Sequence, residues 1–178
     1  IETGKNYLSH QIAHHLTEKL LKRERDELVE SAQTKPPSAS KALLFIDSLE
    51  STFERALEVH VGTEIKTVRL KGLIDRIDRY NDEVRIIDYK SGKCTPEDVT
   101  ITAVSAKSGR TPQEHLARLF ADKKHVFQLL TYNYLYRGKY PHQPYPDKTG
   151  IISLININEG PFYLENKLTP DLPSLMEL

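Results

Sequence analysis

Two aspartates and one lysine have the types and spacing needed to bind a metal ion and cut a phosphodiester bond. Asp75 lies in the stretch KGLIDRIDRY, and Asp88 and Lys90 lie in the following stretch, EVRIIDYKSGK. Each stretch is rich in β-branched residues and alternates apolar with polar positions, which is typical of a strand. Asn81 and Asp82 separate them, so the pattern predicts a β-hairpin with a two-residue turn.

A tight turn at that point fixes the register of the two strands. Asp78 then faces Arg85, a favourable pair, whereas Asp75 faces Asp88 and brings two carboxylates side by side. Because side chains alternate across a strand, Lys90 projects from the same face as Asp88. Two acids and one amine therefore share one patch.

The two carboxylates repel each other and so lower the stability of the fold unless a cation binds between them. Mg²⁺ is the natural candidate, with Mn²⁺ as a substitute. A bound metal polarises a phosphate oxygen and lowers the pKa of its water, while Lys90 holds that water or the developing negative charge. These residues predict phosphodiester hydrolysis by an activated water, without a covalent intermediate. The alternative is that Asp75 and Asp88 merely lie at a solvated sheet edge.

Three motifs occur in a fixed order along the chain: GLIDRID from Gly72, DYKSG from Asp88 and QLLTY from Gln128. Together they resemble the PD-(D/E)XK nuclease superfamily, and within it the RecB-like nuclease domains of bacterial helicase–nucleases and AddB-like exonucleases. The resemblance covers most of the chain, but the specific motifs lie between residues 72 and 132.

The resemblance implies that Asp75 and Asp88 are the metal-binding acids and that Lys90 is the catalytic lysine. It also implies that the backbone carbonyl of Tyr89 is a further metal ligand.

Gln128 and Tyr132 belong to the third motif. They are four residues apart and share one face of a helix, where they could brace the site or touch DNA. The alternative for Tyr132 is an ordinary core position.

Relatives of this kind carry a histidine on an early helix, and His14 is the candidate metal ligand, with His10 and His15 as competitors. Glu58 resembles a supporting glutamate that family members place before the metal strand. Some relatives also hold an iron–sulfur cluster through four cysteines, but Cys94 is the only cysteine here. We therefore expect no such cluster within this fragment.

The periodicity predicts an α/β fold with a mixed central sheet, an antiparallel meander and flanking helices, as in a restriction-endonuclease-like core. The early helices and the meander come first, followed by a long loop, further helix and a last strand. The predicted ranges are helices at 7–28 and 42–57, the meander at 57–89, the loop at 91–112, helix at 112–136 with a break near Asp122, and a strand at 150–158.

Charge is balanced overall, with 25 basic and 25 acidic residues, so composition neither favours nor excludes a nucleic-acid partner. Between residues 66 and 124, however, basic residues outnumber acidic ones. Lys93, Lys107 and Arg110 lie in the predicted loop that leaves the metal strand, where they could contact the phosphates of DNA. A solvated basic face is the alternative, and nothing in the sequence predicts recognition of particular bases.

The length of 178 residues predicts one domain over residues 1–178, and the start at Ile1 suggests a fragment of a larger protein. No apolar run is long enough to cross a membrane, so we expect a cytoplasmic protein. The resemblance implies that it is bacterial and associated with the nucleoid. The predicted activity is a Mg²⁺-dependent deoxyribonuclease, an exonuclease rather than an endonuclease, working with a helicase domain or subunit in recombination and repair. A catalytically inactive DNA-binding module and a protein-interaction module remain as alternatives.

Overall fold

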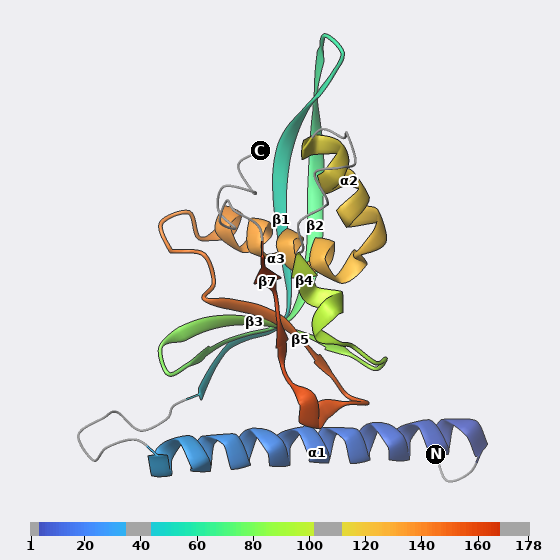
Figure 1. Ribbon diagram of the computed structural model, residues 1–178, viewed down its shortest axis with the longest axis vertical. Coiled ribbons are helices and arrows are strands. Elements are labelled where there is room, and N and C mark those ends of the chain that lie inside the picture. Colours follow the sequence, from blue (N-terminus) through green and yellow to red (C-terminus); the bar gives the residue numbers. More distant parts are fainter. Residues whose placement is uncertain (1–3, 35–43, 102–111, 168–178) are drawn as a thin grey trace.

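The computed structural model describes residues 4–34, 44–101 and 112–167 and consists of a central sheet with helices on both faces (Figure 1). The elements in chain order are α1 (Gly4–Thr34), β1 (Leu44–Val61), β2 (Glu64–Tyr80), β3 (Glu83–Lys90), the 3₁₀ turn η1 (Pro96–Val99), β4 (Thr100–Ile101), α2 (Pro112–Asp122), α3 (Lys124–Lys139), β5 (Lys148–Ser153), the 3₁₀ turn η3 (Ile157–Glu159), β6 (Phe162–Tyr163) and β7 (Glu165–Asn166).

The main sheet has five strands in the order β1-β2-β3-β5-β6. The first three strands form an antiparallel meander, β5 runs parallel to β3, and β6 closes the sheet antiparallel to β5. A second sheet pairs the short strands β4 and β7 in parallel. The predicted mixed α/β architecture is confirmed.

The turn between β2 and β3 lies where the sequence predicts it. Asn81 and Asp82 have φ angles of 53° and 71°, the left-handed conformation that a type I′ hairpin turn requires at both central residues. Tyr80 consequently pairs with Glu83, and Asp78 pairs with Arg85. The predicted register of the hairpin is confirmed.

The helix predicted over residues 42–57 is wrong, because residues 44–57, the described part of this segment, lie within strand β1. Its apolar residues do recur at helical spacing, but from Phe53 onwards they also fit a period of two, through Leu57 to Val61. Pairing with β2 continues along nearly the whole of β1, from Leu44 to Val61. Tertiary pairing with a strand already specified by its own β-branched residues outweighs the local helical pattern.

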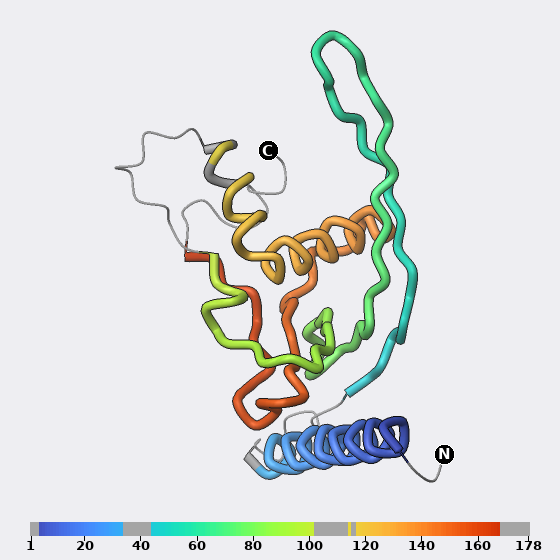
Figure 2. Tube along the Cα trace, turned by 90° about the vertical axis from the view of Figure 1, so that its right-hand side faces the viewer, coloured from blue at the N-terminus to red at the C-terminus, as the bar shows by residue number. Residues whose placement is uncertain are grey.

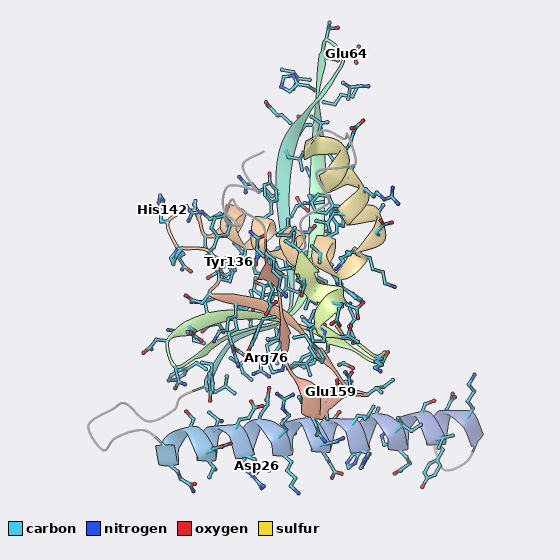
Figure 3. All side chains as sticks on the ribbon, in the orientation of Figure 1. Asp26, Glu64, Arg76, Tyr136, His142 and Glu159 are labelled. Atoms are coloured by element: carbon cyan, nitrogen blue, oxygen red, sulfur yellow. The ribbon has the colours of Figure 1, made fainter. Side chains whose placement is uncertain are left out.

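The outer parts of β1 and β2 extend beyond the sheet as a two-stranded ribbon that stands apart from α2 (Figures 1 and 2). One face of the ribbon continues the surface that α3 covers: Phe53 and Leu70 pack against the core there. Farther out, Val61 and Val68 are exposed. Glu64 lies near the tip of this ribbon (Figure 3).

Helix α3 covers the face of the sheet on which the core of the protein lies. Leu129 and Leu135 are fully buried against Ile77 and Ile86 of the central strands. The predicted helical region is confirmed, including its break, since α2 ends at Asp122 and α3 begins at Lys124. The strand predicted at 150–158 is shorter in the structure, because β5 ends at Ser153.

Helix α1 crosses the opposite face beside β3 and β5 (Figure 1). Leu20 is its buried anchor and packs with Ile87, Ile152 and Ile157. The helix predicted at 7–28 is confirmed and longer than expected, although Leu8 and other apolar residues of its first half are exposed. In the described part of the chain, no helix is both long and apolar enough to span a bilayer.

Candidate active site

The predicted site lies where β2 and β3 separate. Their backbone pairing ends at Arg76 and Ile87, one step before Asp75 would pair with Asp88. Beyond that point the Asp75 carboxylate replaces the missing ladder bond, since its Oδ2 accepts a hydrogen bond of 2.8 Å from the amide of Tyr89. The separation of the strands thus places the Asp75 carboxylate where a sheet hydrogen bond would otherwise run.

Two side chains of helix α3 bind the carboxylate of Asp88. The residue is only 2% exposed, and its Oδ1 accepts hydrogen bonds from Nε2 of Gln128 at 2.9 Å and from the hydroxyl of Tyr132 at 3.1 Å. Gln128 also donates to the Tyr132 hydroxyl at 2.7 Å. The prediction that Gln128 and Tyr132 share one helical face is confirmed, and that face meets the Asp88 carboxylate.

Lys90 lies on the same face of β3 as Asp88, as alternation along the strand predicts. Its Nζ is 2.7 Å from Oδ2 of Asp88, and its side chain is 28% exposed. That buried oxygen makes an ion pair with Lys90 but has no partner in hydrogen-bonding geometry among the described residues. One oxygen of Asp88 is therefore fixed by α3, while the other faces the ammonium group of a partly exposed lysine.

Burial controls the ionisation of this cluster. Desolvation raises the pKa of Asp88 above the usual range of an aspartate; the Lys90 ammonium opposes the shift, and the Asp75 charge adds to it. Burial, followed by the nearby Asp88 charge, also raises the pKa of Tyr132, so its hydroxyl stays protonated and donates to the carboxylate. Even beside the Lys90 ammonium, the charged form of Asp88 is therefore less favourable in this site than in water.

These groups fit a hard divalent cation. The candidate donors are the Asp75 and Asp88 carboxylates and the backbone carbonyl of Tyr89, which follows Asp88 in the chain, and oxygen ligands are those that Mg²⁺ prefers. Oδ2 of Asp88, which is paired only with the Lys90 ammonium, could bind such an ion if Lys90 gave way. Among described residues, no group of three or more His, Cys, Asp and Glu side chains could hold a metal, so a site here would depend on the carbonyl and water.

Glu50 is a neighbour of the site that the sequence does not reveal. It lies on β1 between Leu49 and Ser51, whose partners on β2 flank Asp75. Its φ of 45° is unusual for a glutamate and marks a local distortion of β1. An open hollow of about 550 Å³ is lined by Leu49, Glu50, Asp75 and Tyr89. Because the sequence predicted a helix for this segment, it did not predict that Glu50 lies near Asp75. That contact exists only because β1 pairs with β2.

His125 is a second neighbour that the motifs do not include. It precedes Gln128 by three residues and Tyr132 by seven, which places all three on one helical face. Burial, together with the positive charges of Lys90 and Lys124, lowers the pKa of His125. The helical spacing from Gln128 was the available signal for this residue.

The structure does not bring His14 or Glu58 to the two aspartates. His14 is exposed on the first half of α1, with its Nδ1 3.5 Å from Glu18, and its stacking neighbour is His10. Glu58 pairs with Thr67 in the ribbon. Eight residues of extended strand separate Thr67 from Asp75, roughly 26 Å at about 3.3 Å per residue. Roles for both residues remain predictions without support from the geometry.

Of the predicted DNA contacts, only Lys93 falls within the described residues, and it is exposed just beyond β3. Lys107 and Arg110 lie outside the described residues. The predicted loop over 91–112 contains η1 and β4 in its described part.

The match with a known family agrees with this arrangement. The family model of the PD-(D/E)XK nuclease superfamily matches residues 5–171, which is nearly the whole chain. The chain therefore belongs to the PD-(D/E)XK nuclease superfamily. Comparison with curated proteins gives no match, and comparison with solved structures gives none either.

Proposed function

We propose that this chain is a metal-dependent DNA nuclease whose active site is formed by Asp75, Asp88 and Lys90. The observation that carries the proposal is the position of Asp88, whose buried carboxylate is fixed on one oxygen by α3 and faces Lys90 with the other. Membership of a nuclease superfamily supports the same chemistry. Asp88 and Lys90 lie at the end of β3, and Asp75 lies within β2 just beyond its last pair with β3.

Each side chain has a defined task in this proposal. Asp75 and Asp88, with the Tyr89 carbonyl, would hold Mg²⁺ or Mn²⁺, and such a cation supplies polarisation of a phosphate oxygen and a more acidic water. Lys90, whose side chain is partly exposed, would leave Asp88 and stabilise negative charge that develops on the phosphate. Gln128 and Tyr132 keep the Asp88 carboxylate in one orientation.

Cleavage assays on linear single- and double-stranded DNA in Mg²⁺ or Mn²⁺ test this proposal. Lys90→Ala should reduce the rate by about 10²- to 10³-fold, as expected when a group that stabilises transition-state charge is removed. Lys66→Ala is the matched control, since Lys66 is an exposed lysine of the ribbon paired with Glu64. Equal rates in the wild type and Lys90→Ala would contradict the assignment of Lys90.

One observation favours a second candidate, a nuclease-like module that binds DNA without cutting it. Lys90 forms an ion pair with Asp88 at 2.7 Å, which neutralises the carboxylate without any metal. If the pair never opens, the protein binds DNA but shows neither metal binding at this site nor cleavage. A purely protein-binding module would in addition show no affinity for DNA.

The finer role belongs to the same proposal. We infer that residues 1–178 form one nuclease domain that acts as an exonuclease in a recombination or repair helicase–nuclease, in the bacterial cytoplasm near the nucleoid. The support is the order of the GLIDRID, DYKSG and QLLTY motifs, which resembles RecB-like domains. Measuring cleavage of circular against linear DNA separates endonuclease from exonuclease action.

A further inference from the structure

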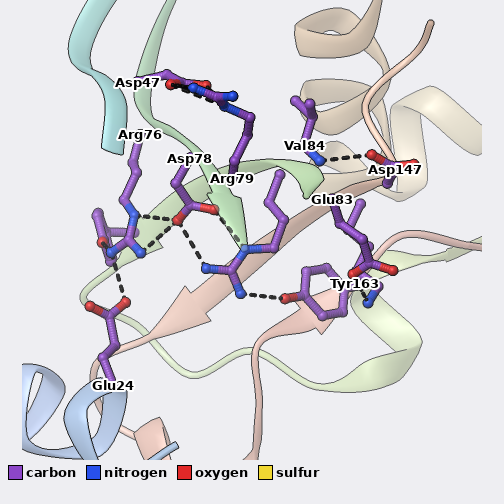
Figure 4. Close-up of polar contacts among 12 residues, drawn as sticks. Glu24, Asp47, Arg76, Asp78, Arg79, Glu83, Val84, Asp147 and Tyr163 are labelled. Atoms are coloured by element: carbon purple, nitrogen blue, oxygen red, sulfur yellow. Dashed lines mark hydrogen bonds and ion pairs between the residues drawn. The ribbon is translucent and has the colours of Figure 1, made fainter. Parts of the chain in front are cut away.

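A buried ionic network lies on the α1 face of the sheet, behind the candidate active site (Figure 4). Asp78 is fully buried and is bound by two arginines: Nε of Arg76 lies 2.6 Å from its Oδ2, and Nε of Arg85 lies 2.7 Å from its Oδ1. Arg76 is only 3% exposed and also donates to Glu24 of α1 at 2.7 Å. The network ties α1 to the central strands, and Figure 3 shows Arg76 on the side of the body that faces α1.

Tyrosine hydroxyls complete the network at two places. Nη1 of Arg76 donates to the hydroxyl of Tyr89 at 2.9 Å, and Nη1 of Arg85 donates to the hydroxyl of Tyr163 at 3.3 Å. Tyr163 belongs to β6 at the far edge of the sheet. Tyr89, in contrast, stands between Asp88 and Lys90 in the chain.

Tyr89 is bound to β2 twice, once through its backbone amide and once through its side-chain hydroxyl, beyond the point where strand pairing ends. Its amide donates to the Asp75 carboxylate at 2.8 Å, and its hydroxyl accepts from Arg76 at 2.9 Å. These two bonds take over from the ladder between β2 and β3, whose last pair is Arg76 with Ile87. Together with the ladder that pairs this end of β3 with β5, they set how far the end of β3 lies from β2.

We propose that Arg76 and the hydroxyl of Tyr89 are positioning groups for the active site. By anchoring the Tyr89 side chain on the α1 face, they hold the Tyr89 backbone, whose amide is bonded to Asp75, and with it the spacing between Asp75 and Asp88. Groups that hold metal ligands in place commonly contribute 10- to 100-fold to metal affinity. The inference rests on the proposed function for its metal, but not for its geometry.

Two tyrosine substitutions in the same network provide a matched test. Tyr89→Phe and Tyr163→Phe each remove one hydroxyl bound by a buried arginine, and each keeps the aromatic ring in place. If the network only contributes stability, the two variants should behave alike. If it positions the site, only Tyr89→Phe should change the site.

The first measurement needs no metal. Amide hydrogen exchange of residue 89, whose N–H is bound to Asp75, should be about fivefold faster in Tyr89→Phe and unchanged in Tyr163→Phe, as expected for loosening by one hydrogen bond. The second is calorimetric titration with Mn²⁺, where Tyr89→Phe should bind about tenfold more weakly than the wild type and Tyr163→Phe should bind as the wild type does.

Unchanged exchange at residue 89, or equal losses in both variants, would overturn the positioning role even if the wild type binds Mn²⁺ and cuts DNA. A wild type that neither binds Mn²⁺ nor cuts DNA would refute the proposed function instead, and the metal-positioning role with it. Faster exchange at residue 89 together with selectively weaker Mn²⁺ binding supports the inference.

Discussion

Replacing Asp88 by asparagine separates the cost of burying a charge from the benefit of binding a cation. The pKa of Asp88 is raised by burial, so folding favours its protonated form. That contribution to stability is complete below the ordinary pKa of an aspartate and is lost as the pH rises through the higher, folded-state pKa. At pH 7 the metal-free protein therefore carries an unfavourable carboxylate, and Asp88→Asn should be no less stable than the wild type.

A divalent cation should make the wild type more stable than Asp88→Asn. A cation at a hundredfold excess over its Kd raises the free energy of unfolding by about 2.7 kcal/mol. For a chain of this size, 1 kcal/mol corresponds to a shift in Tm of about 2–4 °C. The wild type should thus gain roughly 5–11 °C in saturating Mn²⁺. Asp88→Asn should gain little, because it removes the oxygen that the α3 hydrogen bonds leave free.

The assay is thermal unfolding followed by circular dichroism, at neutral pH, with and without Mn²⁺. Asp78→Asn is the control for a buried aspartate on the opposite face, where two arginines bind it. Breaking that buried ion pair should lower the free energy of unfolding by about 3–5 kcal/mol but keep part of the gain from Mn²⁺, because Asp78 is linked to the site only through Arg76. A full Mn²⁺ gain in Asp88→Asn, or its unfolding without metal, would refute the reasoning.

Two further substitutions probe how α3 supports the site. Tyr132→Phe removes the hydroxyl that donates to Asp88 at 3.1 Å and should lower the free energy of unfolding by about 1 kcal/mol, measured by urea denaturation; an unchanged midpoint would contradict this bond. Gly72→Ala would place a Cβ 2.7 Å from Cδ1 of Leu135 and should cost about 1–3 kcal/mol by overpacking in the same assay, whereas equal stability would show that α3 can shift freely.

Residues close together in the chain, and short patterns within one hairpin, were predictable from the sequence. The turn at Asn81 and Asp82 has its own chemistry, and a two-residue turn permits only one register for β2 and β3. The position of Lys90 beside Asp88 follows from alternation along one strand. The shared face of Gln128 and Tyr132 follows from helical periodicity.

Contacts between distant segments could not be predicted in this way. The segment around Leu49 has helical spacing, and only its pairing with β2 makes it a strand and brings Glu50 beside Asp75. The sequence likewise suggests that His14 approaches the acids, but α1 is anchored through Leu20 and Glu24, farther along the helix.

The sequence by itself predicted the chemistry of the candidate site, that is, which two carboxylates and which lysine form it, because motif spacing along strands and helices is a local property. The tertiary structure alone decided how that site is supported. It ended the β2–β3 ladder at Arg76, turned Asp75 toward the Tyr89 amide, and placed a buried arginine network behind the site. Those arrangements depend on packing between segments distant in sequence, which no local pattern encodes.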